Sequence, residues 1–245
     1  VMTFIFNLIH LIYSYFHTVH ENDYQNKSLA NGFILVLDYC NMTLKNVKQS
    51  LNKITKDLAV TQDSREFLLK NTREIIILCS KSIIAVHKGE LVTAKNNLKQ
   101  ADALLKKYKK KATGQLRRYL ITPEQEFVEA ACLIAIVEKK DIPSDKKLAV
   151  MPESYVLGLL DCVGELKRRV FDEMRTGEID EAIRFFEIME NLYLQLYTFS
   201  LYDKVVKEAR RKIDVNRILV DDVRSAITEE KRRIELIKAL EKIEK

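Results

Sequence analysis

The runs QEFVEAACLIAIVE at residues 125–138 and SYVLGLLDCVGEL at residues 154–166 are apolar stretches of helical length and composition. Each run is interrupted by two carboxylates, Glu126 and Glu129 in the first and Asp161 and Glu165 in the second. Spacings of three and four residues place each pair on one face of its helix. The two runs therefore predict mostly buried helices that carry acids toward the protein interior.

The scarcity of turn residues around these runs indicates an all-α fold. The 245 residues include only six glycines and three prolines, which favours a few long helices over a sheet of many short strands. Glycine-rich phosphate loops, alternating strand patterns and tandem repeats are absent from the sequence. We predict a single all-α domain of about six to seven helices, with long helices packed antiparallel.

The expected helices follow from hydrophobic spacing and from the residues that end it. Leu44, Val47, Leu51, Ile54 and Leu58 form a heptad seam in a first long helix from about residue 42 to 87, which Gly89 ends. Thr122-Pro123 predicts either the start of a helix or a kink inside a longer one. One further helix either starts at residue 122 or runs from 115 to 140. The others are expected at 91–108, 144–149, 153–175, 178–198 and from 201 to the charged tail.

Residues 1–41 differ in composition from the rest of the chain. They are apolar and aromatic and contain a single basic residue, Lys27. The stretch MTFIFNLIHLIYSYF at residues 2–16 is short for a membrane span and lacks a cleavage site. We expect this leader to be mis-annotated or disordered, with Met42 as the natural start and residues 42–245 as the helical domain. An uncleaved membrane anchor is the alternative.

Charge and cysteine usage point to a basic cytoplasmic protein. The formal net charge is +6 and the pI is about 9.0, a balance that favours a polyanionic partner. We expect no membrane partner. Four cysteines lack a CxxC spacing, so buried reduced thiols are the simple interpretation.

The acid pairs allow two interpretations. In the first, each acid forms a structural ion pair with a nearby base such as Arg168 or Arg169. In the second, all four acids bind one or two hard divalent cations, for which carboxylate oxygens suit Mg²⁺ or Mn²⁺ better than iron or zinc. A di-iron site needs histidine ligands, and His87, the only histidine outside the leader, is expected to lie far from both pairs. Glycines 158 and 164 leave two gaps beside Asp161 that could admit a neighbouring helix or a ligand.

Basic residues beside an aromatic side chain form the predicted nucleic-acid contacts. Such groups can hold phosphates while the ring stacks on a base. Arg117, Arg118 and Tyr119 lie on or just before the helix that carries Glu126, and Arg168 follows Glu165. A solvated helix face remains the alternative for each basic cluster.

Four segments give the chain a resemblance to the translin superfamily, and within it to the catalytic translin-associated factor X branch. They are QEFVEA at 125–130, PESYVLGLLDCVGELKRRV at 152–170, RTGEIDEA at 175–182 and LYDKVVKEARRKIDVNRILVDDVRSAITEE at 201–230. The resemblance implies an all-helical fold assembled into a closed multi-subunit shell, an octamer for example, that encloses single-stranded RNA. It also implies either a homo-oligomer or a second, translin-like chain.

The resemblance further implies the activity and its residues. Glu126, Glu129, Asp161 and Glu165 match the acids of the family's Mg²⁺-dependent endoribonuclease site. Translin's nucleic-acid-binding positions fall near Gln115, Arg117 and Tyr119, of which only Arg117 is a cation here. The expected function is Mg²⁺-dependent cleavage of single-stranded or small RNA. Glu129 and Asp161 would be the metal ligands. Glu126 and Glu165 would be further ligands or the base. The alternative is a non-catalytic binding protein for single-stranded DNA or RNA.

Overall fold

The computed structural model describes the backbone of residues 23–243 and the side chains of residues 43–242. Two units are distinguished, the first ending at Thr61 and the second spanning Gln62–Lys245, and the boundary falls inside a helix. Between residues 23 and 243 the chain is helical without strands, as predicted. The elements are α2 (Asp23–His87), α3 (Leu91–Lys109), η1 (Gly114–Leu120), α4 (Ile121–Val137), α5 (Asp145–Leu148), α6 (Pro152–Thr176), α7 (Ile179–Leu196), η2 (Tyr197–Tyr202) and α8 (Ala209–Ile243).

The first helix starts earlier than the sequence indicated. We expected it from about residue 42, whereas α2 already begins at Asp23 and passes through the proposed start at Met42 without a break. The rest of the leader, residues 1–22, lies outside the described residues, so its assignment stays a prediction. None of the described helices is long and apolar enough to cross a membrane.

The heptad seam of α2 lies in the first unit, where it is exposed. Leu44, Val47, Leu51, Ile54 and Leu58 each keep between 46% and 62% of their surface accessible. Within the described part of the chain, these side chains are not part of the hydrophobic core. The seam is therefore an apolar helix face that the described residues of its unit leave exposed.

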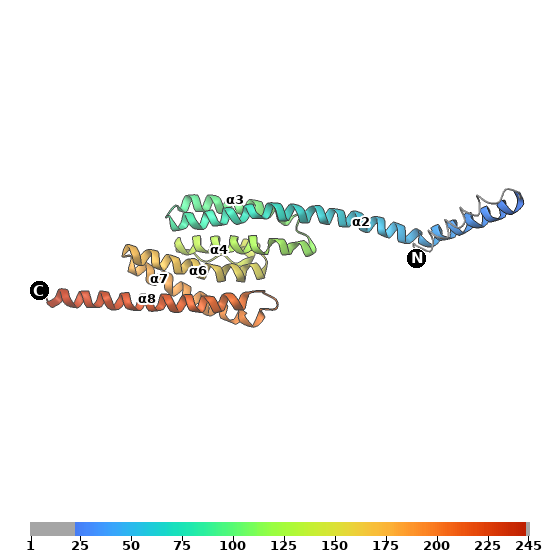
Figure 1. Cartoon of the computed structure of the whole chain (residues 1–245). Coiled ribbons are helices and arrows are strands. Elements are labelled where there is room, and N and C mark those ends of the chain that lie inside the picture. Colours follow the sequence, from blue (N-terminus) through green and yellow to red (C-terminus); the bar gives the residue numbers. More distant parts are fainter. Residues whose placement is uncertain (1–22, 244–245) are drawn as a thin grey trace. The chain divides into compact units, whose positions relative to one another are not determined.

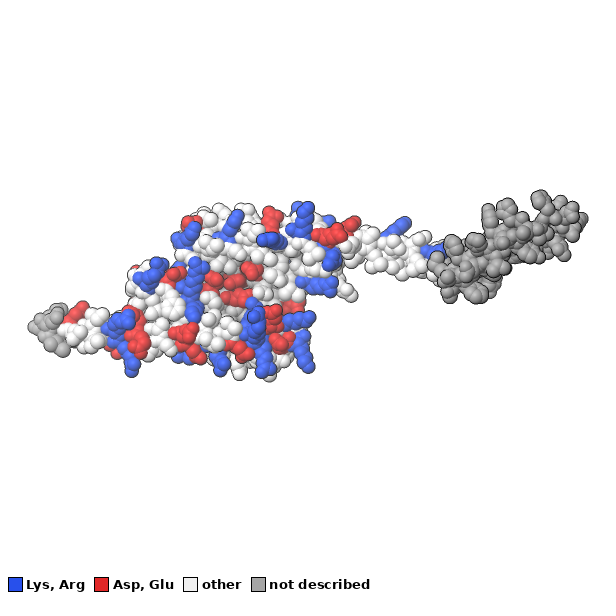
Figure 2. Space-filling view, viewed as in Figure 1, with Lys and Arg blue, Asp and Glu red and all other residues white. Residues whose placement is uncertain are grey.

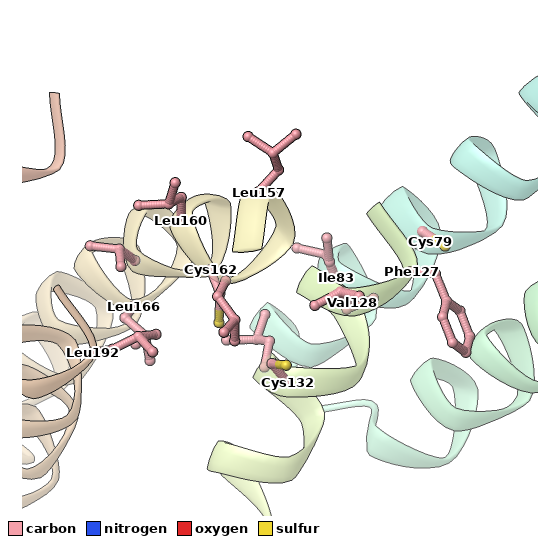
Figure 3. Packing of buried hydrophobic residues seen from close by; sticks show 14 of the residues in the cluster. Cys79, Ile83, Phe127, Val128, Cys132, Leu157, Leu160, Cys162, Leu166 and Leu192 are labelled. Atoms are coloured by element: carbon pink, nitrogen blue, oxygen red, sulfur yellow. The ribbon is translucent and has the colours of Figure 1, made fainter. Parts of the chain in front are cut away.

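The core of the second unit is built around α4 and α6. Helix α4 is buried almost all round from Phe127 to Ile136, as its apolar sequence predicted. Helix α6 packs between α4 on one side and α7 and α8 on the other. Figure 3 shows part of this core, in which Val128 and Cys132 of α4 lie beside side chains of α2 and α6. Three thiols, those of Cys79, Cys132 and Cys162, are fully buried there.

Helix ends in this unit follow the capping residues of the sequence. Pro152 occupies the first turn of α6, where its missing N–H costs no helical hydrogen bond. Gly177 ends α6 in the left-handed region at φ 85°, which a glycine adopts without strain. Helix α4 begins at Ile121, directly after the 3₁₀ turn η1, so Pro123 lies in a first turn and not at a mid-helix kink. Helices α3 and α4 run antiparallel, as do α6 and α7, and α7 and α8, whereas α4 and α6 pack parallel and α8 points in the same direction as both (Figure 1).

Candidate active site

The acid helices are held together by a close approach at Gly158. A Cβ added to this glycine would lie 2.5 Å from the backbone oxygen of Gln125 and 2.6 Å from the Cβ of Val128. Any side chain at position 158 would therefore push α6 away from α4. Gly164 has no heavy atom within 4 Å of such a Cβ, so only the first of the two predicted gaps admits a neighbour.

The close approach brings the four predicted acids to one pocket. This pocket has a volume of about 510 Å³ and is open to solvent. Its lining consists of side chains from α2, α4, α6 and α8, namely Ser80, Ile83, Ile84, Gln125, Glu126, Glu129, Asp161, Glu165, Arg168 and Lys212. Two acid pairs 35 residues or so apart in the sequence thus share a single cavity, which we call the acid pocket. Figure 2 shows acids gathered near the middle of one face of this unit, with lysines and arginines around them.

Two of the four carboxylates lack a protein partner. Among the described residues, neither Glu126 nor Glu129 has a hydrogen bond or an ion pair. Glu129 is only 8% exposed, and burial, followed by the negative charges of Asp161 and Glu126, raises its pKa to about 9. Burial and Asp161 also raise the pKa of Glu126, while the ammonium of Lys212 opposes the rise. A buried carboxyl group without a donor is unfavourable in its charged form, so this pocket favours a bound cation or proton.

The other two carboxylates are held by side chains that we did not assign to the site. Asp161 accepts hydrogen bonds from the amide of Gln125 and from the ammonium of Lys212. Lys212 stands in the basic cluster at 210–212. It lies on the same face of α8 as the buried Ile213 and Asn216, and that spacing is the signal that could have found it. The predicted ion pair of these acids with Arg168 or Arg169 is absent from the described residues, because Arg169 pairs with Glu173 instead.

The expected separation of His87 from the acids is wrong. Its side chain is 4% exposed, and its Nε2 lies 2.5 Å from Oε2 of Glu165. Its Nδ1 lies 3.4 Å from Oδ2 of Asp172, which follows Glu165 by two turns of α6. Spacing along the sequence could not reveal this contact, because it depends on how the end of α2 packs against α6.

The donor set of the acid pocket fits a hard divalent cation in its chemistry. All four carboxylates offer oxygen ligands, and two of them have no competing donor in the described part of the chain. Within residues 43–242, however, no three acid, histidine or cysteine side chains are arranged as ligands around one point. Since Lys212 and Gln125 hold Asp161 while His87 holds Glu165, these side chains must turn for all four to reach one ion.

The predicted nucleic-acid residues are only partly brought to the acids. Arg168 lines the acid pocket and has no carboxylate partner among the described residues. Arg118 lines a neighbouring cavity. Arg117 is exposed, and Tyr119 accepts hydrogen bonds from Arg65 (2.9 Å) and Arg118 (3.1 Å). Those two guanidinium groups lower the pKa of the Tyr119 phenol. Neither Arg117 nor Tyr119 lines either pocket.

A further buried acid, Glu124, has a structural position. It is 1% exposed, and its Oε1 lies 3.2 Å from Nζ of Lys109. Its Oε2 accepts a hydrogen bond of 2.9 Å from the backbone N–H of Met151. Glu124 therefore ties α4 to the end of α3 and to the start of α6, on the side of α4 away from the acid pocket.

Comparison with known sequences shows a family match over most of the chain. The sequence model of the Translin family matches residues 7–227. An uncharacterized protein of Methanocaldococcus jannaschii is 38% identical over 174 residues, which cover 70% of this chain and 78% of that protein.

Comparison with solved structures gives the same fold. The chain is similar to AfC3PO, with a TM-score of 0.69 and 33% identity over 75% of this chain and 97% of that one. A second structure, AfC3PO in complex with duplex RNA, gives a TM-score of 0.68 with 32% identity over the same shares. A third similar structure is apo-NeC3PO, with a TM-score of 0.64 and 22% identity over 73% of this chain and 95% of that one. The last of these likenesses concerns the fold alone.

Proposed function

The chain belongs to the translin family, and we propose that it is a Mg²⁺-dependent endoribonuclease of the translin-associated factor X branch, with Mn²⁺ as an alternative metal. The observation that carries this proposal is the shared pocket of Glu126, Glu129, Asp161 and Glu165, in which two carboxylates have no partner among the side chains of residues 43–242. A purely structural set of acids would have its donors in place, as Glu124 has.

The metal would be held by Glu129 and Asp161, with Glu126 and Glu165 as further ligands or as the base that orients the attacking water. Bound Mg²⁺ would supply a water of lowered pKa and neutralise charge on the phosphate. Arg168, exposed at the rim of the acid pocket without a carboxylate partner, is placed to bind the scissile phosphate. His87 keeps the Glu165 carboxylate in the pocket through its Nε2 contact.

The substrate class in this proposal is RNA, and we expect single-stranded RNA or a small structured RNA. Support comes from the net charge of +6 and from the similar AfC3PO structure in complex with duplex RNA. Single-stranded DNA is a second ligand to compare. Because that solved complex holds a duplex, the experiments below should include a duplex RNA of matched sequence.

The proposed assembly is a homo-oligomeric shell such as an octamer, with a translin-like second chain as the alternative. The exposed seam from Leu44 to Leu58 supports it, since an uncovered apolar helix face is typical of an interface. Light scattering of the purified full chain measures the subunit count. A monodisperse monomer at micromolar concentration would contradict the shell.

The deciding experiment compares the natural chain with Asp161→Ala on labelled RNA, in Mg²⁺ and in EDTA. Loss of this carboxylate should lower the Mg²⁺-dependent cleavage rate by about 100-fold or more, while binding in EDTA stays close to the natural value. Glu187→Ala is the matched control, because Glu187 is an exposed acid outside the pocket. Equal cleavage by Asp161→Ala and the natural chain would refute the assignment.

A second candidate function is a non-catalytic RNA- or DNA-binding protein of the same family. The observation in its favour is that Asp161 and Glu165 are already engaged by Lys212, Gln125 and His87. Binding in both Mg²⁺ and EDTA, with cleavage in neither, would favour this candidate.

A further inference from the structure

A second cavity adjoins the acid pocket. Its volume is about 460 Å³, and it is more enclosed than the acid pocket. It is lined by Arg118, Ile121, Thr122, Gln125, Glu153, Leu157, Val205, Lys207, Glu208 and Lys212. Gln125 and Lys212 belong to both linings, so these two side chains form the wall between the cavities. The volume lies in the range of small-ligand sites, about 300–1,000 Å³.

Of the three cations that line this cavity, Lys212 is paired with Asp161, whereas Arg118 and Lys207 are not neutralised by any described acid. Among the described residues, neither Arg118 nor Lys207 has a carboxylate within ion-pair distance. Of the two acids in the lining, Glu208 is already paired with Arg211 at 2.8 Å. The first turns of α4 and α6 and the residues just before α8 contribute to the wall.

The other wall residues suit the remaining parts of a nucleotide. Ile121, Leu157 and Val205 offer an apolar surface for a base. Glu153 is partly exposed without an ion pair among the described residues, so its carboxylate can accept a hydrogen bond from a ribose hydroxyl or a base N–H. Cationic, apolar and acceptor groups in one cavity match a nucleotide better than free phosphate, which would use only the cations.

We propose that this cavity binds one nucleotide of the RNA strand next to the scissile phosphate, with Arg118 and Lys207 on its phosphate. The proposal rests on the proposed function, since the neighbouring phosphate then lies on the acid-pocket side of Lys212 and Gln125. A nucleotide held here fixes the position of the strand relative to the acids. It therefore decides which bond is presented for cleavage.

The test uses two matched pairs of variants in the segment before α8. Lys207→Glu and Lys204→Glu reverse the charge of two exposed lysines, of which only Lys207 lines the cavity. Val205→Glu and Leu201→Glu add a charge at apolar residues that are 70% and 83% exposed, of which only Val205 lines the cavity. Because all four side chains are exposed, none of these changes should prevent folding, and circular dichroism checks this.

Binding of a short fluorescent single-stranded RNA is measured in EDTA, so that cleavage plays no part. We expect Lys207→Glu and Val205→Glu to weaken binding about 10-fold relative to their controls. Lys207→Glu should also reduce the slope of log affinity against log salt by about one. Inorganic phosphate as competitor should have little effect, whereas a nucleoside monophosphate should compete. Equal affinities within each pair, or equal competition by phosphate, would overturn the proposal.

Cleavage in Mg²⁺ separates this proposal from the proposed function. If the natural chain cuts RNA while each variant behaves as its control, the subsite is wrong and the nuclease stands. If the natural chain binds RNA with the expected variant effects but never cuts it, the cavity remains a nucleotide site and the nuclease is wrong. Absence of RNA binding by the natural chain would reject both.

Discussion

Helix α4 carries two buried carboxylates, Glu124 and Glu129, in opposite circumstances. Glu124 is 1% exposed and has both oxygens satisfied, by the ammonium of Lys109 and by the backbone N–H of Met151. Glu129 is 8% exposed and has neither an ion pair nor a hydrogen bond among the described residues. Burial alone therefore does not mark an acid as functional. The missing partner distinguishes the two sites.

The largest expected effect on stability comes from the ion pair between Glu124 and Lys109. Lys109→Met leaves the carboxylate of Glu124, which is 1% exposed, without its counter-charge, and stranding a buried charge in this way should lower the free energy of unfolding by about 3–5 kcal/mol. Urea denaturation at pH 7 measures the change. The double variant Glu124→Gln with Lys109→Met should recover part of the loss, because it removes the unpaired charge as well. A loss below 1 kcal/mol would erase the contrast between Glu124 and Glu129.

A substitution at Glu129, which has no partner among the described residues, should change the stability in the opposite direction. The pKa of Glu129 is raised to about 9 from an ordinary value of 4.5. Its contribution to stability is thus complete below pH 4.5 and is lost as the pH rises through 9. In EDTA at pH 9, Glu129→Gln should therefore increase the free energy of unfolding by about 2–4 kcal/mol.

At pH 4.5 the same substitution should have little effect, since the carboxyl is protonated in the folded chain and half protonated in the unfolded chain, which leaves a difference of only about 0.4 kcal/mol. Denaturation at the two pH values, with Glu187→Gln as an exposed-acid control, tests this sign. A Glu129→Gln variant that is less stable than the natural chain at pH 9 would show that Glu129 has a structural partner after all.

The smallest of the three effects concerns the close contact between α4 and α6 at Gly158. Gly158→Ala places a methyl group against the backbone oxygen of Gln125 and the Cβ of Val128, and such overpacking should cost about 1–3 kcal/mol. Gly164→Ala is the matched control, because its methyl meets no neighbour. It should stabilise the helix by about 0.5–1 kcal/mol. Thermal unfolding of both variants sharpens the comparison, and equal melting temperatures would contradict it.

The sequence was sufficient to predict the helical architecture of the second unit. Helices α3, α6 and α7 lie within a few residues of their expected ranges, because capping residues and hydrophobic spacing are local signals. Helix α2 starts at Asp23, 19 residues before the expected start near residue 42, because the change in composition there is not a structural boundary. The backbone continues through it as one helix.

The candidate site was predicted from the sequence only in part. The four acids and Arg168 line one pocket, as helical spacing and the order of the motifs indicated. Their catalytic and metal-binding roles stay predictions. The partners Lys212 and His87 depend on packing between distant helices, α8 or α2 against α6. Glu124 was likewise missed, because its neighbour Lys109 is brought to it only by the packing of α3 against α4.

The three buried thiols can report how often the helix core opens. Burial raises the pKa of Cys132 to about 12 and holds the pKa values of Cys79 and Cys162 well above their usual range. A thiol reagent can therefore react with them only during moments when α2, α4 and α6 separate. The labelling rate of these natural cysteines counts such openings directly, without any engineered probe. A ligand that bridges α4 and α6 will make such openings rarer and will therefore slow the labelling of these cysteines.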